Sequence, residues 1–372
     1  MIEEHWGYVQ DHVRTAAFRR ALAELVRPGD RVLDLGCGVG ILGALALEAG
    51  AVHVTAIDET DVTLMAAETF ARMGASDRAT ILQGHASHLS LDEPVDLILC
   101  DHVGFFALDY GILALLQDAR ARFLKPGGRI LPRSVDLFLA PVQSDEARHL
   151  SHGWRDDRVP GPLHWISDHA VNHKHAVTLK PGMILGDPVR IDSIDFLTET
   201  RSFLSWTATL VAARRGWLHG LGGWFDCRLG PSTGMTNSPL DAGRIDRSQV
   251  FFALEDSIAV AAGDEIRVAL SARPDADLFV WDVEHLRTGH RQKHSTWEGQ
   301  VTRRADLTAL RPDMVPVLDQ AAAARQIVLG YCDGQRSLAQ IEAAVLRDHP
   351  GLFPTPDAIT DFVRACVYRA TR

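Results

Sequence analysis

A glycine-rich turn near the start of the chain carries the first residues whose types and spacing could do chemistry. Residues 32–40 read Val-Leu-Asp-Leu-Gly-Cys-Gly-Val-Gly, so an apolar run ends in an acid and is followed by Gly36, Gly38 and Gly40. Glycines permit a tight turn with positive φ and let a ligand approach the backbone. A helical pattern begins at Ile41, and its free N–H groups would point at the same place. The turn therefore predicts a ligand site, although its spacing is neither the phosphate-binding G-x-x-x-x-G-K-S/T nor the G-x-G-x-x-G of dinucleotide-binding proteins.

A carboxylate follows the next strand-like run. Residues 52–57 are β-like and end in Asp58, about twenty residues after the first glycine, which is where such folds place an acid that binds ribose. The alternative is that Asp58 only caps the helical pattern that starts near Asp61. Because the glycines precede it, we favour the ribose role.

The glycine turn resembles motif I of class I methyltransferases that use S-adenosylmethionine. This resemblance implies that S-adenosylmethionine is the cofactor and that the glycines make room for its methionine end. The cofactor residues implied in this motif are Asp34, Gly36, Cys37, Gly38 and Gly40.

Two further segments resemble the protein arginine methyltransferases in particular. The string Asp-His-Val-Arg-Thr at 11–15 is similar to the segment that folds over the cofactor in that family. It implies that Arg14 pairs with the carboxylate of S-adenosylmethionine, a task suited to a planar guanidinium, whereas the alternative is a solvated helix charge. Ala86 and Ser87 fall where these enzymes hold the adenine, with Ser87 standing where the family usually has a glutamate.

The acceptor side departs from the same family. In those enzymes a hairpin after the fourth strand supplies two glutamates that fix the plane of a guanidinium and can accept its proton. Here the matching stretch is 100–111, with Asp101 at the first position, Tyr110 at the second and Asp109 one step earlier. An aspartate is one methylene shorter, which withdraws its carboxylate by roughly 1–1.5 Å along a C–C step. The supporting Thr-His-Trp string is also replaced, by residues 245–249.

Three interpretations of this hairpin remain open. Asp101 with Asp109 or Tyr110 could still orient a guanidinium. The pocket could instead serve another nucleophile, with Asp101 or His102 as the general base. Asp101 could also merely cap the hairpin of a protein that binds without catalysis. We favour the second interpretation, although His102 could equally be a residue of the pocket wall.

The elements that must position these residues fall into two patterns. Strand candidates at 31–35, 52–57, 79–83 and 95–100 alternate with helical patterns near 40–49, 61–73 and 111–124, after an amphipathic helix at 5–26. Such alternation predicts an α/β, doubly wound, Rossmann-like sheet. From about residue 134 onward, short alternating runs predict an antiparallel β-barrel. Its strand candidates are 135–142, 188–196, 204–213, 217–229, 248–253, 264–271 and 278–283.

The predicted domain organisation follows from these patterns and from the resemblance. The expected parts are a cofactor-binding domain at 1–133, a β-barrel substrate domain at 134–285 with a dimerisation arm near 154–185, a linker at 286–304, and a helical module at 305–372. The module's helical runs at 321–331, 338–346 and 357–368 resemble the helical part of PqqD-like winged-helix modules, which hold leader peptides. The alternative is a plain three-helix bundle.

Composition excludes several classes of function. The chain has 372 residues and a net charge of −10, which argues against nucleic-acid binding. It has no apolar run of membrane-spanning length and no signal-peptide pattern. Five dispersed cysteines indicate reduced thiols and a cytoplasmic protein. Histidines at 164–175 and 285–294 lack complementary ligands, so we expect no metal site.

The sequence therefore predicts a methyltransferase that uses S-adenosylmethionine and acts on nitrogen in a peptide or protein side chain, not necessarily arginine. The family resemblance implies a homodimer. A free small-molecule or natural-product acceptor is one alternative, and a non-catalytic protein that binds S-adenosylmethionine or peptide is the other.

Overall fold

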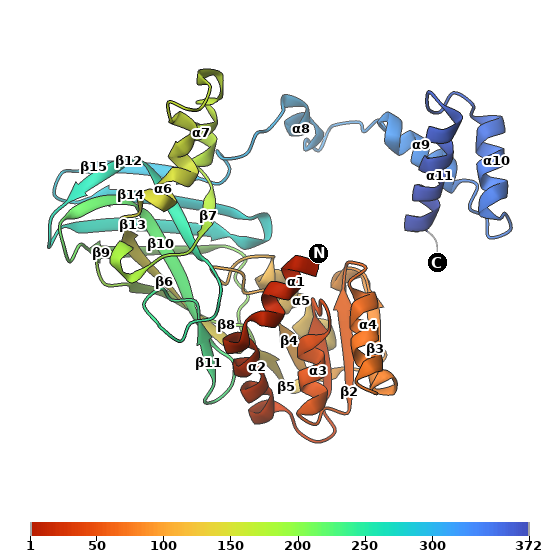
Figure 1. The fold of residues 1–372 in the computed structure, drawn as a ribbon, viewed down its shortest axis with the longest axis horizontal. Coiled ribbons are helices and arrows are strands. Elements are labelled where there is room, and N and C mark those ends of the chain that lie inside the picture. The colour runs from red at the N-terminus through yellow and green to blue at the C-terminus, as the bar shows by residue number, and fades with distance from the viewer. Residues whose placement is uncertain (1, 371–372) are drawn as a thin grey trace. The chain divides into compact units, whose positions relative to one another are not determined.

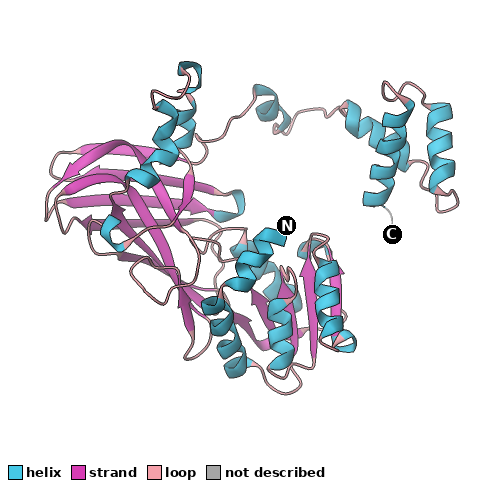
Figure 2. Ribbon diagram, in the orientation of Figure 1, coloured by secondary structure: helices cyan, strands magenta, loops and turns pink. Residues whose placement is uncertain are grey.

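The computed structural model describes residues 2–370, and the chain divides into two compact units at residues 301/302 (Figures 1 and 2). The first unit contains a parallel sheet followed by two antiparallel sheets. The second unit is helical. Each unit is described by itself.

Five parallel strands form the first half of the larger unit. Their order is β3-β2-β1-β4-β5, and every neighbouring pair is parallel. The elements are β1 (Arg31–Leu35), α3 (Ile41–Glu48), β2 (His53–Asp58), α4 (Thr63–Arg72), β3 (Ala79–Gln83), β4 (Val95–Cys100), α5 (Ile112–Phe123) and β5 (Leu124–Leu131). This topology confirms the predicted doubly wound sheet, in which the carboxyl ends of β1, β2 and β4 meet at one edge.

Strand β5 is absent from the sequence prediction. Its sequence contains Pro126, Gly127 and Gly128, which normally interrupt strands. Proline is tolerated because β5 is the edge strand of the sheet, and its register against β4 shifts between Val95 and Leu97.

The amphipathic pattern at 5–26 forms two helices and not one. They are α1 (Ile2–Gln10) and α2 (His12–Leu25). The break lies at Asp11, whose Oδ1 accepts a hydrogen bond from Arg14 N at 2.9 Å and so caps α2.

Two antiparallel sheets form the second half of this unit, which we call the β half (residues 134–295). One sheet has the order β7-β12-β10-β6-β8 with β11 beside β10, and the other has the order β15-β14-β13-β9. The strands are β6 (Ser134–Val142), β7 (Lys174–Val177), β8 (Val189–Asp195), β9 (Leu204–Val211), β10 (Gly216–Arg228), β11 (Gly234–Thr236), β12 (Gln249–Val260), β13 (Glu265–Arg273), β14 (Leu278–His285) and β15 (His290–Ser295). All of the predicted strands of this half are present.

The predicted linker at 286–304 is wrong where β15 runs. Residues 290–295 pair with β14 over the whole length of the strand. Their sequence, His-Arg-Gln-Lys-His-Ser, has no apolar alternation because β15 is an edge strand in which only His294 is buried. The segment at 154–185, predicted to be an arm, contains the short helix α7 (Ile166–Ala170) and β7, and follows α6 (Asp145–His152).

One hydrophobic core joins the parallel sheet to the β half. It includes Leu97 and Ile98 of β4 together with Leu139 of β6 and Phe225 of β10, all buried. Phe106, which follows β4, meets the ring of Phe252 in β12 edge-on at 5.9 Å. The two halves are therefore packed rigidly enough to place groups from both around one site.

The smaller unit contains α8 (Arg304–Ala309), α9 (Gln320–Leu329), α10 (Leu338–Asp348) and α11 (Pro356–Ala370). Its core is made by Val328, Ile341, Val345, Ile359 and Val363. Ser337 caps α10, as predicted, in a reciprocal pairing with Gln340. Between residues 302 and 370 the structure has no strand. The β-strands that would form the wing of a winged-helix module are therefore absent from these residues, and the resemblance to such a module is not confirmed.

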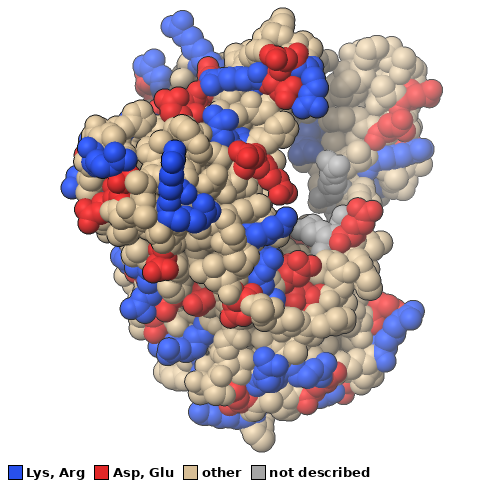
Figure 3. All heavy atoms as spheres, turned by 60° about the vertical axis from the view of Figure 1, so that its left-hand side comes forward, with Lys and Arg blue, Asp and Glu red and all other residues tan. Residues whose placement is uncertain are grey.

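Within residues 2–370, no helix is both long enough and apolar enough to cross a membrane. Basic and acidic side chains are interspersed on the face shown in Figure 3. The net charge of −10 is therefore not gathered into one field on that face.

Candidate active site

A crevice opens at the carboxyl ends of β1, β2 and β4. Its main cavity has a volume of about 660 Å³, and its walls come from the glycine turn, the end of β2, the hairpin after β4, the first two helices and Arg247 of the β half. A second cavity of about 250 Å³ shares Gly36, Asp58 and His102 with the first, so the two lie side by side. This is the edge at which open α/β sheets bind ligands.

The glycine turn brings bare backbone to the crevice. Gly36, Gly38 and Gly40 have φ values of +68°, +52° and +84°. A Cβ on Gly36 would lie 2.1 Å from His102 Nε2, and one on Gly38 would lie 3.0 Å from His5 Nδ1. The positive φ values are those that the sequence predicted for the turn, and the close approach to its backbone is made by the His102 and His5 side chains.

Asp34 does not line the crevice, which corrects its prediction as a cofactor-binding residue. Its Oδ2 accepts a hydrogen bond from Gly43 N at 2.8 Å, and the side chain is buried. Burial raises the pKa of this carboxyl to about 7. Asp34 therefore ties α3 to β1. Cys37 does line the crevice, and burial raises the pKa of its thiol far above the ordinary value, so the thiol stays neutral.

Asp58 lies at the end of β2 and lines both cavities. Its Oδ2 accepts from Gly38 N at 3.1 Å, and its Oδ1 accepts from Thr60 N at 3.0 Å and Thr60 Oγ1 at 2.8 Å. Glu59 and Thr60 line both cavities as well. Sequence reasoning missed these two, although their place directly after the strand-end acid was a usable signal.

The smaller cavity is bounded by the segment after β3. Ala86 and His85 line it, whereas Ser87 does not. Ser87 Oγ lies 2.5 Å from His85 Nδ1, and His85 is the residue that faces the cavity. The predicted adenine role therefore fits Ala86 and His85 better than Ser87, which is a correction.

Arg14 lines the crevice but points at the acceptor-side carboxylate. The residue is only 4% exposed, and its Nε donates to Asp101 Oδ2 at 2.5 Å. Its Nη1 also donates to Tyr8 O at 3.3 Å. To pair with a cofactor carboxylate, as predicted, the guanidinium of Arg14 must either bind that carboxylate and Asp101 together or break its hydrogen bond to Asp101.

Arg247 is a residue of this site that the sequence did not reveal. It comes from the segment before β12, and its Nη1 and Nη2 approach Asp101 Oδ1 at 3.4 Å and Oδ2 at 3.2 Å. Burial alone would raise the pKa of Asp101, but Arg14 and Arg247 outweigh it, so the pKa lies below the ordinary value and Asp101 is a carboxylate. In the sequence, Arg247 could have been singled out only by its place in residues 245–249, which replace the Thr-His-Trp string.

His102 and Tyr110, which were predicted to face an acceptor, also line the crevice. The His102 ring packs over Gly36, and burial lowers its pKa, so the imidazole is neutral near pH 7. His102 Nδ1 is buried without a hydrogen-bond partner. Tyr110 has φ +53°, and its ring meets His102 edge-on at 6.2 Å.

Asp109 does not line the crevice, which corrects its prediction as a catalytic residue. Its Oδ2 accepts from Phe105 N at 2.9 Å and Phe106 N at 2.8 Å, and its Oδ1 accepts from Lys174 Nζ at 2.6 Å. The side chain is 3% exposed. Asp109 thus holds the hairpin in shape and joins it to β7.

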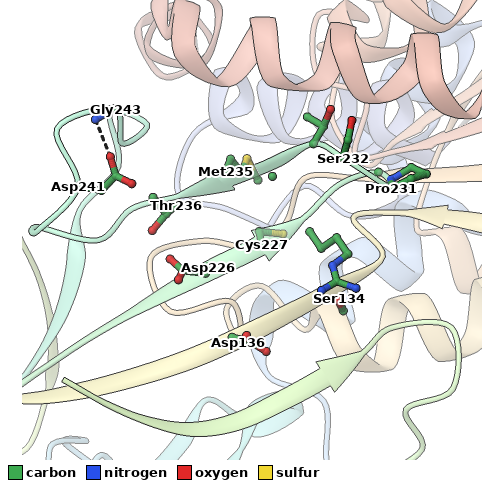
Figure 4. A pocket seen from close by; sticks show the side chains of 14 residues that line it. Ser134, Asp136, Asp226, Cys227, Pro231, Ser232, Met235, Thr236, Asp241 and Gly243 are labelled. Atoms are coloured by element: carbon green, nitrogen blue, oxygen red, sulfur yellow. Dashed lines mark hydrogen bonds between the residues drawn. The ribbon is translucent and has the colours of Figure 1, made fainter.

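A separate cavity of about 490 Å³ lies on the β half, between β6, β10 and β11 (Figure 4). Asp136, Asp226 and Asp241 face it, and Asp241 Oδ1 accepts from Gly243 N at 2.7 Å. It shares no lining residue with the crevice.

The crevice fits S-adenosylmethionine in three respects. The glycine turn has no Cβ, the carboxylate of Asp58 lines the cavity beside it, and α3 begins directly after the turn.

Comparisons with known proteins point the same way. A family model described as a methyltransferase domain matches residues 32–128. Probable protein arginine N-methyltransferase 6 of Arabidopsis thaliana is 36% identical over 155 residues, which are 41% of this chain and 36% of that relative. Probable protein arginine N-methyltransferase 6.2 of Oryza sativa subsp. indica is 30% identical over 259 residues, which are 66% of this chain and 65% of the relative.

The fold has a solved counterpart. The Trypanosoma brucei PRMT1 enzyme–prozyme heterotetrameric complex with AdoHcy matches with a TM-score of 0.70 and 22% identity, covering 78% of this chain and 97% of that one. The chain spans less than two thirds of the length of the first two relatives.

Proposed function

We propose that this chain, which has a methyltransferase domain and is built like a protein arginine methyltransferase, transfers a methyl group from S-adenosylmethionine to a side chain of a peptide or protein. The observation that carries the proposal is one crevice lined both by the glycine turn and by Asp101, His102 and Tyr110. When bound, the cofactor supplies an electrophilic methyl group on a sulfonium.

The cofactor side of the crevice is assigned first. Gly36 and Gly38 allow the cofactor to approach the backbone, and Asp58 accepts hydrogen bonds from the ribose hydroxyls. Arg14 pairs with the cofactor carboxylate once its guanidinium turns from Asp101. Ala86, with Glu59 and His85 beside it, bounds the adenine.

The acceptor side then orients the nucleophile. Methyl transfer depends mainly on bringing the nucleophile into line at the methyl carbon and on excluding water. Tyr110 and His102 form the wall, and Asp101 fixes the two arginines. Of these groups, only His102 can accept a proton at a ring nitrogen, and its lowered pKa makes it a weak base.

A non-catalytic protein is the second candidate, and one observation favours it. Asp101, the carboxylate nearest the acceptor, is already paired with two arginines of the same chain. The two candidates differ in methyl transfer. Calorimetry with S-adenosylhomocysteine and transfer of radiolabelled methyl to peptides should both give signals for an enzyme, whereas binding with no transfer supports the second candidate.

We also propose a homodimer through residues 154–185, because the matched structure is an oligomer by its own description.

The helical unit is proposed to hold the peptide acceptor. Removing residues 305–372 should then raise KM for a peptide and leave S-adenosylhomocysteine affinity unchanged. A cytoplasmic setting is proposed because all five cysteines are free thiols.

A further inference from the structure

The backbone around Arg247 is held from several sides. Its N–H donates to Ile245 O at 2.9 Å, and its O accepts from Gln249 Nε2 at 3.0 Å. The preceding residue, Asp246, donates its N–H to Asp11 Oδ2 at 2.9 Å. The Arg247 side chain is 10% exposed. Its place beside the crevice is therefore set by the fold and is not that of a mobile surface arginine.

The guanidinium of Arg247 stands where a cationic acceptor would stand. Each of its two terminal nitrogens approaches a different oxygen of Asp101, at 3.4 and 3.2 Å, and Nη1 also approaches Gly104 O at 3.5 Å. This two-pronged approach is the one by which a guanidinium recognises a carboxylate. A substrate arginine would have to displace a group tethered to the same chain, at an effective concentration that is roughly millimolar or higher.

The charges on the acceptor side disfavour a cation for a second reason. With Arg14 paired to the cofactor carboxylate, as proposed above, the single negative charge of Asp101 is balanced by Arg247, and the other carboxylates of the crevice, Asp58 and Glu59, lie on the cofactor side. His102 contributes no charge near pH 7, since burial lowers its pKa. A bound sulfonium would add positive charge, and like charges in a partly buried site repel.

We propose that Arg247 fills the position of a cationic acceptor and directs the site to a carboxylate of a peptide, an inference that rests on the proposed function. A carboxylate oxygen attacks the methyl carbon, the new C–O bond forms as the C–S bond breaks, and the electron pair of the broken bond stays on sulfur. The products are a methyl ester and S-adenosylhomocysteine. No proton leaves the acceptor, so the reaction needs no general base.

This assignment replaces the nitrogen acceptor that the family resemblance implies. A nitrogen acceptor must lose a proton, and Asp101, the carboxylate of the hairpin after β4, is engaged by Arg247. The hydrogen bonds of Arg247 to Asp101 and to Gly104 O, at 3.2–3.5 Å, use only its terminal nitrogens. Its guanidinium therefore has capacity to bind a second carboxylate.

The first test is methyl transfer by the full chain. Three pools of heptapeptides with acetylated and amidated ends are used. The central residue is Asp or Glu in the acidic pool, Arg in the second pool, and His, Lys or Tyr in the third. With tritiated S-adenosylmethionine, we expect label in the acidic pool that mild alkali releases as volatile methanol. Alkali-stable label in either of the other pools overturns the proposal.

The second test measures binding and does not depend on turnover. S-adenosylhomocysteine-loaded protein is titrated by NMR with N-acetyl-glutamate N-methylamide and with the arginine equivalent. The wild type should bind the glutamate probe at least five-fold more tightly, and Arg247→Gln should lose that preference. Arg244→Gln, a change on the same segment that does not line the crevice, should retain it. Equal binding of the two probes, or tighter binding of the arginine probe, by the wild type overturns the proposal whether or not transfer is seen.

Affinity for S-adenosylhomocysteine distinguishes a failure of the proposed role of Arg247 from a failure of the proposed methyltransferase function. Arg247→Gln should bind S-adenosylhomocysteine within three-fold of the wild type. A loss above ten-fold would assign Arg247 to the cofactor and overturn its acceptor role. A wild type that binds no S-adenosylhomocysteine would overturn the proposed function itself.

Discussion

Asp11 joins the N-terminal helices to the β half by accepting a hydrogen bond from Asp246 N at 2.9 Å. The other oxygen of the same carboxylate caps α2 by accepting from Arg14 N, also at 2.9 Å. The two oxygens of Asp11 thus hold the backbone of Arg14 and of Asp246, the residue before Arg247, although Asp11 is not adjacent in the chain to either arginine. The side chain is 6% exposed, so water does not compete for these bonds.

Replacement of Asp11 should loosen both arginines. Asp11→Ala removes the helix cap, which costs about 1 kcal/mol of unfolding free energy, and the bond to Asp246 N, which costs about as much again. Asp11→Asn retains an oxygen for the cap but cannot serve both N–H groups, so its loss should be about half as large. Urea unfolding and S-adenosylhomocysteine calorimetry measure the two effects. Wild-type affinity in the alanine variant would show that the bridge does not position the site.

Gly36→Ala should abolish S-adenosylhomocysteine binding. The new methyl would lie 2.1 Å from His102 Nε2, and φ at this position is +68°. Gly74→Ala is the matched control, because φ there is +69° and nothing lies within 4 Å of an added Cβ. Both variants bear the same backbone strain of about 1 kcal/mol, so an equal loss of thermal stability is expected from that source. Calorimetry should separate them, and equal affinities would argue against a ligand at the glycine turn.

The parallel sheet and the edge expected to hold the ligand were predictable because they depend on local patterns. Apolar runs of strand length end at Leu35 and Ile57, and a glycine turn and an acid follow them. Each signal lies within a few residues of the structure that it predicts. Parallel topology then brings the strand ends together without further information. Local patterns did not predict β15, because its sequence is polar and it forms a strand by pairing with the edge of β14.

The roles of individual carboxylates were harder to predict, because an aspartate that binds backbone looks the same in sequence as one that faces a ligand. Asp34 and Asp109 each serve nearby N–H groups and are buried away from the crevice. The pairing of Arg247 with Asp101 joins residues that are 146 positions apart. It depends on how the β half packs against the parallel sheet, and no periodicity encodes that packing.

Asp34 should make the protein less stable as pH rises. Burial raises its folded pKa to about 7 from the ordinary value of 3.8, so the folded state binds more protons between these values. The stabilising contribution is complete below about pH 4 and is lost as pH rises through 7. Between pH 5 and pH 8 the unfolding free energy should fall by about 1–3 kcal/mol more in the wild type than in Asp34→Asn. Asparagine keeps an acceptor for Gly43 N but does not titrate. Parallel curves for the two proteins in urea unfolding would contradict the assignment.

Lys174 and Asp109 should be energetically coupled, because they join the hairpin after β4 to β7. Lys174 Nζ lies 2.6 Å from Asp109 Oδ1, and its side chain is 11% exposed. Burial alone would lower the pKa of Lys174, but Asp109 and Asp277 outweigh it and raise the pKa, so Lys174 carries its positive charge at neutral pH. A double-mutant cycle of Asp109→Asn and Lys174→Met in urea unfolding should give a coupling of about 1–3 kcal/mol.

The same pair should affect the acceptor and not the cofactor. Neither residue lines the crevice, whereas Tyr110 directly follows Asp109 and does line it. Lys174→Met should therefore raise KM for a labelled peptide while S-adenosylhomocysteine affinity stays within two-fold of the wild type. Lys180→Met, a change at an exposed lysine six positions further along the chain, should alter neither. A coupling below about 0.5 kcal/mol, the lower limit for residues in contact, would mean that the ion pair does not hold the hairpin. A fall in cofactor affinity equal to the rise in KM would mean that the hairpin belongs to the cofactor side.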